Sequence, residues 1–193
     1  MDKRKEFEKE LCYIKNEDIK ESALYMIEKL PDYFFQIPAA STGKYHPAYA
    51  SGEGGLLRHT KAAVRIAHEL LEDPVIGDKY TTREKDIMIF ALILHDGLKL
   101  GRQKSRYTLF DHPILMANFV KEEASNLKLD KKEIQLLSDV ISTHMGNWTV
   151  DYDGNEVLEK PKTKYQNFVH MCDYLASRKC IELEFDKNNN IVK

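Results

Sequence analysis

Hydrophobic residues recur at helical spacing along almost the whole chain, which predicts an all-α fold. The segment IMIFALIL at 87–94 is apolar on all sides, as is typical of a central, buried helix. Thr81 with Glu84, and Asp130 with Glu133, have the spacing of capping boxes and mark two helix starts. We expect helices at 4–14, 17–30, 56–73, 82–97, 112–127, 131–145 and 162–178.

Two stretches depart from the helical period. Residues 36–55 are rich in Gly, Pro, Ser and Ala and predict a long ordered loop, a kind of segment that commonly carries function. Residues 181–185 alternate between apolar and polar and precede an Asn-rich turn, which predicts a small C-terminal β-hairpin. No repeat or internal linker divides the chain. We therefore expect one domain over 1–193, made of a helical extension at 1–35, a core at 36–180 and a hairpin tail at 181–193.

Composition and charge mainly exclude classes of function and location. The formal charge of -2 gives no global attraction to nucleic acid or membranes, and no apolar run reaches transmembrane length. The three cysteines, Cys12, Cys172 and Cys180, lack a metal-binding spacing. Their odd number and the absence of a signal peptide lead us to expect a cytoplasmic protein. The N-terminal helices are expected to form either a packed cap or the face of a homodimer.

Six histidines and aspartates stand at the edges or ends of the predicted helices: His59, His95, Asp96, His112, His144 and Asp173. His59 and His144 lie on inward, apolar stripes, and the His95-Asp96 doublet ends the most apolar helix. A buried imidazole without a partner is destabilised by roughly 1–3 kcal/mol, and a buried carboxylate must be paired or bound to metal. Six such residues suffice to hold two divalent metals, and an aspartate with two oxygens can bridge them.

The remaining histidines differ in their surroundings. His68 shares a face with lysine, arginine and glutamate, which favours a solvated side chain. His170 lies on a polar face one turn before Asp173, so it is expected either on the surface or beside the cluster, and we favour the surface. His46, in the Gly/Pro-rich loop, can reach the mouth of the cluster or remain in solvent.

The order His, His-Asp, His, His and Asp is carried by GGLLRHT at 54–60, LILHDGLKLG at 92–101, DHP at 111–113, STHMGNW at 142–148 and FVHMCDYLASR at 168–178. Through these segments the chain resembles the HD-domain metal-dependent phosphohydrolase superfamily, from about residue 36 to 180. Within it the chain is most similar to the HD domain of bacterial 3′-to-5′ exoribonucleases. That similarity rests on PAA at 38–40, KYHPAYASGEGGLLRHT at 44–60 and KPKTKYQNFVHMCDYLASR at 160–178.

The resemblance implies an all-α HD-type bundle with two divalent metals, drawn from Mn, Fe, Ni, Mg or Zn. One metal would be held by His59, His95, Asp96 and Asp173. The second would be held by Asp96, His112 and His144, with Asp96 as the bridge. Two such metals make hydroxide available near neutral pH for attack on phosphorus. Asp96 and Lys99 would be catalytic, with Lys99 donating to the hydroxide or to a phosphate oxygen.

Substrate contacts are expected beside the cluster. The loop KLGRQKSRY at 99–107 carries three candidate phosphate contacts and one candidate base contact: Arg102, Lys104, Arg106 and Tyr107. The alternative is a solvated run of charge. Trp148 with Asn147 can stack on and hydrogen-bond a base, or Trp148 can plug the end of the bundle. His46 is the last candidate contact.

These residues predict a hydrolase that cleaves a phosphate monoester or diester of a nucleotide or short oligonucleotide. The exoribonuclease family usually carries an extra OB-type module, for which this chain has no room, and the charge is nearly neutral. We therefore expect small substrates to be preferred over long RNA. One alternative is a 3′-to-5′ exoribonuclease on longer RNA. Another is a non-catalytic, metal-containing, nucleotide-sensing module, which the intact ligand set and Lys99 disfavour.

Overall fold

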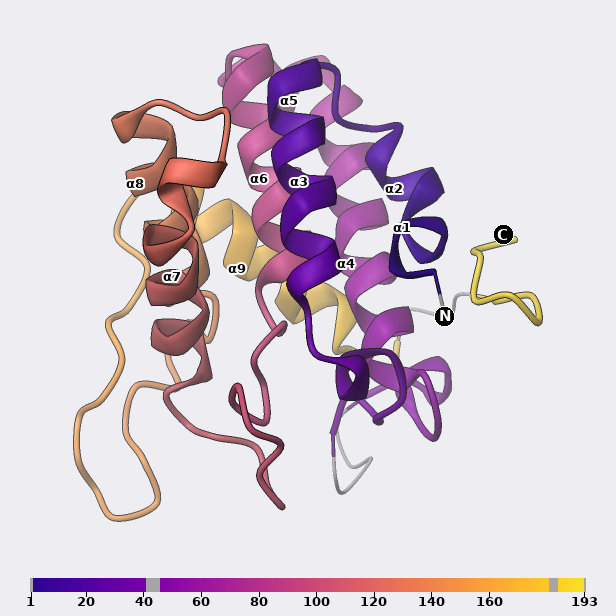
Figure 1. Ribbon diagram of the computed structural model, residues 1–193, viewed down its shortest axis with the longest axis vertical. Helices are drawn as coiled ribbons and strands as arrows, with labels where there is room; N and C mark the ends of the chain where they lie inside the picture. The colour runs from indigo at the N-terminus through magenta and orange to yellow at the C-terminus, as the bar shows by residue number, and fades with distance from the viewer. Residues whose placement is uncertain (1, 41–45, 181–183, 193) are drawn as a thin grey trace.

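The computed structural model describes residues 2–40, 46–180 and 184–192, and within these it is all-α, as predicted (Figure 1). Short 3-10 turns follow α3 at Asp32–Phe35, precede α4 at Ala48–Ala50 and follow α7 at Ala124–Asn126. The helices of the described residues are α1 (Lys3–Glu6), α2 (Glu8–Leu11), α3 (Glu17–Lys29), α4 (Gly55–Glu72), α5 (Pro74–Gly77), α6 (Thr82–Leu94), α7 (His112–Glu122), α8 (Lys131–Ser142) and α9 (Lys164–Ala176).

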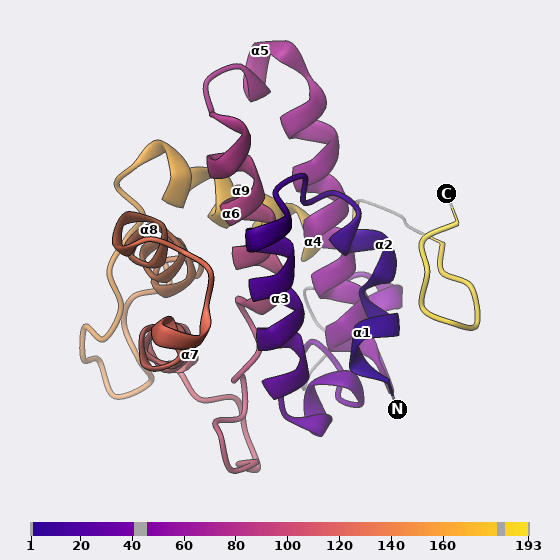
Figure 2. The same ribbon diagram turned by 45° about the horizontal axis from the view of Figure 1, so that its top comes forward.

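Helix α6 is the centre of the bundle. It contacts α3, α4, α8 and α9, and every residue from Asp86 to Leu94 is buried. The predicted helix that is apolar on all sides is therefore confirmed, because neighbours cover α6 all round. In both ribbon views α3 and α4 lie to one side of α6, and the pair α7 and α8 lies to the other (Figures 1 and 2).

The N-terminal segment forms a cap on its own chain. The helix predicted at 4–14 is divided at Phe7, which separates α1 from α2. Phe7 is fully buried, and its ring lies 6.2 Å from that of Phe34 and 6.3 Å from that of Phe35. The prediction of one continuous helix was wrong, because the chain is interrupted at Phe7 to bury this ring against the 3-10 turn.

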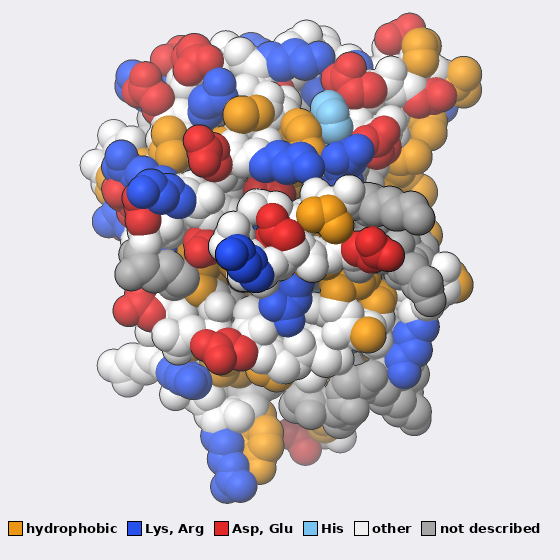
Figure 3. All heavy atoms as spheres, turned by 90° about the vertical axis from the view of Figure 1, so that its right-hand side faces the viewer, with side chains coloured by type: hydrophobic (Ala, Val, Ile, Leu, Met, Phe, Trp, Pro, Cys, Tyr) orange, Lys and Arg blue, Asp and Glu red, His pale blue; other side chains and the backbone are white. Residues whose placement is uncertain are grey.

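Local capping signals were reliable guides to the helix starts. Both predicted capping boxes form, at the start of α6 and at the start of α8. A third box, Thr163 with Gln166, begins α9. No helix of the described residues is both long and apolar enough to cross a bilayer. On the face shown in Figure 3, basic and acidic side chains are interspersed, in keeping with the near-neutral charge.

One end of the bundle gathers the elements that carry the predicted ligands. Helices α4 and α7 begin at the lower end of Figure 1, and α6 and α8 finish there. The connections 97–111 and 145–163 extend below it. The predicted loop 36–55 also lies at this end, where its described parts are tied together by hydrogen bonds from Ala39 N to Ala50 O and from Leu56 N to Ile37 O. Residues 41–45 of that loop lie outside the described residues.

The predicted C-terminal β-hairpin is not formed in the described part of the tail, residues 184–192. A single isolated antiparallel bridge joins Phe185 to Ile191. Between them the Asp186 carboxylate accepts hydrogen bonds from the backbone N–H groups of Asn188 and Asn190, which fixes a turn. The turn occupies most of the segment and leaves one bridge rather than two strands. Residues 181–183, on which the predicted alternation rested, lie outside the described residues.

Candidate metal centre

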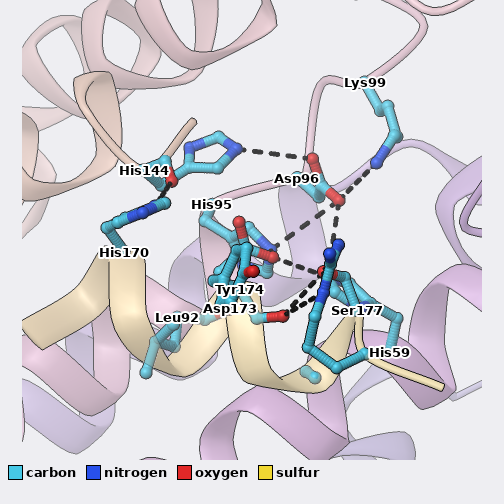
Figure 4. Close-up of polar contacts among 12 residues, drawn as sticks. His59, Leu92, His95, Asp96, Lys99, His144, His170, Asp173, Tyr174 and Ser177 are labelled. Atoms are coloured by element: carbon cyan, nitrogen blue, oxygen red, sulfur yellow. Dashed lines mark hydrogen bonds and ion pairs between the residues drawn. The ribbon is translucent and has the colours of Figure 1, made fainter. Parts of the chain in front are cut away.

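Six side chains from five elements converge at one end of the bundle, and Figure 4 labels five of them, His59, His95, Asp96, His144 and Asp173; the sixth is His112. His59 stands in the first turns of α4, His95 and Asp96 follow α6, and His112 is the first residue of α7. His144 follows α8, and Asp173 lies on α9. The four histidines and Asp96 are at most 3% exposed, and the Asp173 side chain is 16% exposed. The structure therefore brings together all six residues singled out as candidate ligands.

The two carboxylates organise the cluster. Asp173 Oδ1 lies 2.9 Å from His59 Nε2 and 3.4 Å from His95 Nε2. Asp96 faces all four histidines. Its Oδ1 lies 3.0 Å from His112 Nε2 and 3.7 Å from His144 Nε2, and its Oδ2 lies 3.7 Å from His95 Nε2 and 4.0 Å from His59 Nε2. Through its two oxygens Asp96 lies near all four histidines, so it is placed to contact the ligands of both predicted metals.

Three of the histidines are oriented by the same local device. The Nδ1–H of His95, His112 and His144 each donates to the carbonyl oxygen three residues earlier, at 2.7, 2.7 and 2.8 Å. The acceptors are Leu92, Leu109 and Ile141. A neutral imidazole with its proton on Nδ1 keeps a lone pair on Nε2, and this is the usual arrangement of a metal-binding histidine.

The atoms aimed into the cluster fit a metal ion. The Nε2 atoms of His95, His112 and His144 and the Oδ1 of Asp96 are buried, and none makes a hydrogen bond with a described residue. Such buried, unsatisfied atoms are costly unless something completes their coordination. Two groups have ligand atoms close enough to share an ion: His59, His95 and Asp173, and His95, Asp96 and His144.

Both aspartates are held in the ionised form. Burial raises the pKa of Asp96, but Lys99 and the adjacent histidines outweigh it and hold that pKa well below its usual range. Burial likewise raises the pKa of Asp173, but its hydrogen bond with His59 and the nearby His95 imidazole outweigh burial and hold that pKa well below its usual range. The cluster therefore offers two anionic ligands among histidine nitrogen donors, a set suited to divalent transition metals.

Lys99 lies beside the cluster, as its offset from the doublet predicted. Its Nζ is 2.6 Å from Asp96 Oδ2, and the side chain is 13% exposed (Figure 4). The turn that places it depends on Gly97. A Cβ on that residue would lie 2.9 Å from the backbone oxygen of Leu94 and 2.6 Å from Leu30 Cδ2, so a larger residue would collide with the end of α6.

His170 was misjudged from the sequence. It is partly buried, and its Nδ1–H donates to the carbonyl oxygen of His144 at 2.7 Å. Gly146, with φ of 66°, lies against the same ring, where a Cβ would be 2.1 Å from His170 Cε1. His170 thus holds the turn that carries His144. Its position one turn before Asp173 was the only signal in the sequence.

The other two histidines also have partners. His46 reaches the cluster, with its ring centroid 5.2 Å from that of His59, and burial lowers its pKa to about 4. Of the two positions expected for His46, at the mouth of the cluster or in solvent, the structure shows the one at the cluster. His68 is partly buried and stacks on Tyr13 with ring centroids 3.8 Å apart, so the predicted solvated side chain also has one face packed against the protein. The flat face of Tyr13 covers it.

The predicted substrate contacts lie outside the cluster, on the connections around it. Arg102 forms an ion pair with Glu122 of α7 and lies over the Phe119 ring, so it is already engaged. Arg106 lies over the ring of Tyr107, and Lys104 is exposed. Asn147 and Trp148 are also exposed, so Trp148 does not plug the end of the bundle. The role of these residues in substrate binding therefore stays a prediction.

Comparison with known proteins finds relatives that are named 3′-5′ exoribonucleases. The 3′-5′ exoribonuclease YhaM of Shouchella clausii is 30% identical over 69% of this chain and 41% of its own length. The proteins of the same name from Listeria welshimeri and Bacillus subtilis are 28% and 27% identical over 69% of this chain, and 42% and 41% of their own lengths. The chain thus spans about two fifths of the length of these curated relatives.

No protein-family model matches the chain, and no solved structure matches it. The relationship therefore rests on the curated relatives, taken together with the ordered histidines and aspartates that the structure gathers at one end of an all-α bundle. It confirms the resemblance that the motifs carried. Over the matched segment the chain is a relative of the HD-type 3′-5′ exoribonucleases.

Proposed function

We propose that this chain is a metal-dependent phosphodiesterase that removes nucleotides from the 3′ end of RNA. This was the second choice from the sequence, behind a hydrolase of nucleotides and short oligonucleotides. The names of the relatives, all 3′-5′ exoribonucleases, favour this function over hydrolysis of small nucleotides. The matched segment is only about two fifths of each relative, so the length of this chain does not argue against a polymeric substrate.

The observation that carries the proposal is the set of buried, unsatisfied atoms. His95, His112 and His144 direct their Nε2 atoms, and Asp96 its Oδ1, to a common region without hydrogen-bond partners among the described residues. A merely structural cluster would be expected to satisfy these atoms within the protein. In our proposal the residues that hold metal are His59, His95, Asp96, His112, His144 and Asp173, with Asp96 shared between two ions.

When bound, two divalent metals lower the pKa of a water molecule and neutralise charge on the phosphate oxygens. The protein's own groups complete the site. The backbone carbonyls behind His95, His112 and His144 fix the direction of each imidazole, so little reorganisation is needed during reaction. Lys99 places an ammonium beside Asp96 at the edge of the cluster, where it can donate to a phosphate oxygen.

The test uses a 20-nucleotide RNA labelled at its 5′ end, incubated with the protein and Mn²⁺ and resolved on a sequencing gel. We expect a ladder that shortens from the 3′ end, and the same RNA labelled at its 3′ end should release labelled mononucleotide at once. A panel of mononucleotides and bis-p-nitrophenyl phosphate is assayed in parallel at matched salt. An intact 20-mer beside rapid nucleotide hydrolysis would restore the small-substrate alternative, and inactivity on every substrate would favour a non-catalytic module.

A further inference from the structure

Two connections at the ligand-bearing end of the bundle expose large apolar side chains. Tyr107 is 65% exposed, Trp148 61%, Val150 50% and Tyr152 99%. Scattered single residues of this kind are ordinary, but a gathering on neighbouring loops usually marks a binding surface. Phe110 joins the two loops, because its ring lies 6.4 Å from that of Tyr152 in an edge-on arrangement. We call the four aromatic residues of this group, Tyr107, Phe110, Trp148 and Tyr152, the aromatic rim.

In the second loop, the connection 145–163, backbone hydrogen bonds fix the chain and leave several side chains exposed. Val157 N donates to Thr149 O, Asp151 N donates to Asn155 O, and Val150 pairs with Glu156 in an isolated bridge. The Asp151 carboxylate accepts from the backbone N–H groups at 153 and 155 and tightens the turn. Successive side chains of an extended segment point to opposite sides. Thr149 accordingly is buried, whereas Trp148 and Val150 are exposed, and Tyr152 is exposed on the turn that follows.

The chain connectivity places this rim beside the proposed catalytic cluster. The connection 97–111 begins directly after Asp96 and ends directly before His112. The connection 145–163 begins directly after His144. Both loops extend from the same end of the bundle (Figure 1). A polymer whose end entered the cluster would therefore pass over one or both of them.

The two loops carry opposite charge. Residues 99–107 contain four lysines and arginines and no acidic residue. Residues 147–163 contain four acidic residues and two lysines. A phosphate backbone would be attracted to the first loop and repelled by the second, whereas an uncharged base can stack on aromatic rings regardless of the acidic side chains. This division suits a strand whose backbone follows the basic loop and whose bases face the aromatic one.

We infer that the aromatic rim stacks the unpaired bases of single-stranded RNA just upstream of the 3′ end, an inference that rests on the proposed exoribonuclease function. Stacking on Tyr152 and its neighbours tolerates any base, because every base has a flat face. In a duplex those faces are hidden by pairing partners and adjacent bases, so the rim selects single strands. The ligand class is therefore single-stranded RNA of mixed sequence.

The experiment measures binding apart from hydrolysis. Fluorescence anisotropy of a labelled 12-nucleotide RNA is followed with the full chain in EDTA, so that cleavage is suppressed. We expect Tyr152→Ala to weaken binding roughly 5- to 150-fold, the range that corresponds to the loss of one stacking ring. Tyr152→Phe keeps the ring and should bind like the wild type. Val75→Ala, at an exposed apolar residue of α5 away from the rim, is the matched control and should also bind like the wild type.

The outcomes separate this inference from the proposed function. Ring-dependent binding in a protein that never shortens RNA would support the rim and reject the nuclease. Unchanged binding by Tyr152→Ala in a protein that does shorten RNA would overturn the rim alone, as would equal affinity for a duplex of the same sequence. If Tyr152→Ala leaves RNA binding intact but abolishes self-association in light scattering, the rim is instead an interface between copies of this chain, and the inference is overturned.

Discussion

His170 donates a hydrogen bond from Nδ1 to the backbone carbonyl of His144, at a distance of 2.7 Å. The bond ties α9, which carries Asp173, to the turn that carries His144. Gly146 allows the ring to lie flat against that turn, because any side chain there would collide with it. The position of one proposed ligand is therefore set by a residue 26 positions away in the sequence.

Removing that donor should loosen the metal site without unfolding the protein. We expect His170→Phe, which keeps a ring of similar shape, to weaken metal binding by about 10-fold or more, as is typical when a group that orients a ligand is lost. His170→Asn places an amide donor near the position of Nδ1 and should restore part of the affinity. Metal titration monitored by RNA hydrolysis gives both values, and wild-type affinity in His170→Phe would show that the hydrogen bond is dispensable.

Asp96→Asn should abolish hydrolysis. The amide has nearly the same shape, but it carries no charge and cannot bridge two cations, and Lys99 would lose its partner 2.6 Å away. The rate of RNA shortening is measured together with the circular dichroism spectrum. Substantial residual activity in a folded variant would show that Asp96 is not the shared ligand.

His112→Ala distinguishes one metal from two. His112 contacts Asp96 but not Asp173, so its loss should lower metal content by about one equivalent while the other ion remains. The matched control is His68→Ala, which removes a partly buried histidine stacked on Tyr13 and away from the cluster. If His112→Ala retains full metal content and full activity, one ion is sufficient and His112 is structural.

A buried ion pair away from the cluster should make stability depend on pH. Lys61 Nζ lies 4.0 Å from Glu10 Oε2, and both atoms are buried without a hydrogen bond to a described residue. Burial lowers the pKa of Lys61 and raises that of Glu10. Loss of one partner of such a pair typically costs about 3–5 kcal/mol of unfolding free energy, because the other charge is left buried.

The sign of the pH effect follows from the raised pKa of Glu10. A carboxyl group whose folded pKa is raised stabilises the fold below its unfolded pKa of about 4.3, and this contribution is lost as pH rises through the folded value. Lys61→Met removes the cation that favours ionised Glu10, so its destabilisation should be smallest near pH 4 and largest near neutrality. The double variant Lys61→Met/Glu10→Gln should lose this pH dependence. Urea unfolding at several pH values measures both, and a pH-independent penalty in Lys61→Met would contradict the assignment.

The local features of the fold were predictable from the sequence, because they depend on residues a few positions apart. The capping boxes of α6 and α8, the apolar stretch at 87–94 and the offset of Lys99 from Asp96 are of this kind. The convergence of six ligands was also predictable, since each stands at a helix end or on an inward stripe and their order matches a known pattern.

Most of the failures have one physical cause, which is contact between distant segments. Phe7 divides the first predicted helix because it packs under the turn at Asp32–Phe35. His170 was assigned to solvent, and the packed face of His68 was not predicted, because their partners, His144 and Tyr13, lie far away in sequence. The hairpin failed for a different, local reason: the side chain of Asp186 binds the backbone of its own turn and leaves only one bridge.

The most direct test of the account is the metal content of the wild-type protein, purified without chelator and measured by inductively coupled plasma mass spectrometry alongside its rate of RNA shortening. The account predicts more than one equivalent of divalent transition metal per chain, because two groups of ligands share the cluster. It also predicts that chelation removes the metal and the activity together and that Mn²⁺ restores the activity. A metal-free preparation that shortens RNA at the full rate would contradict it.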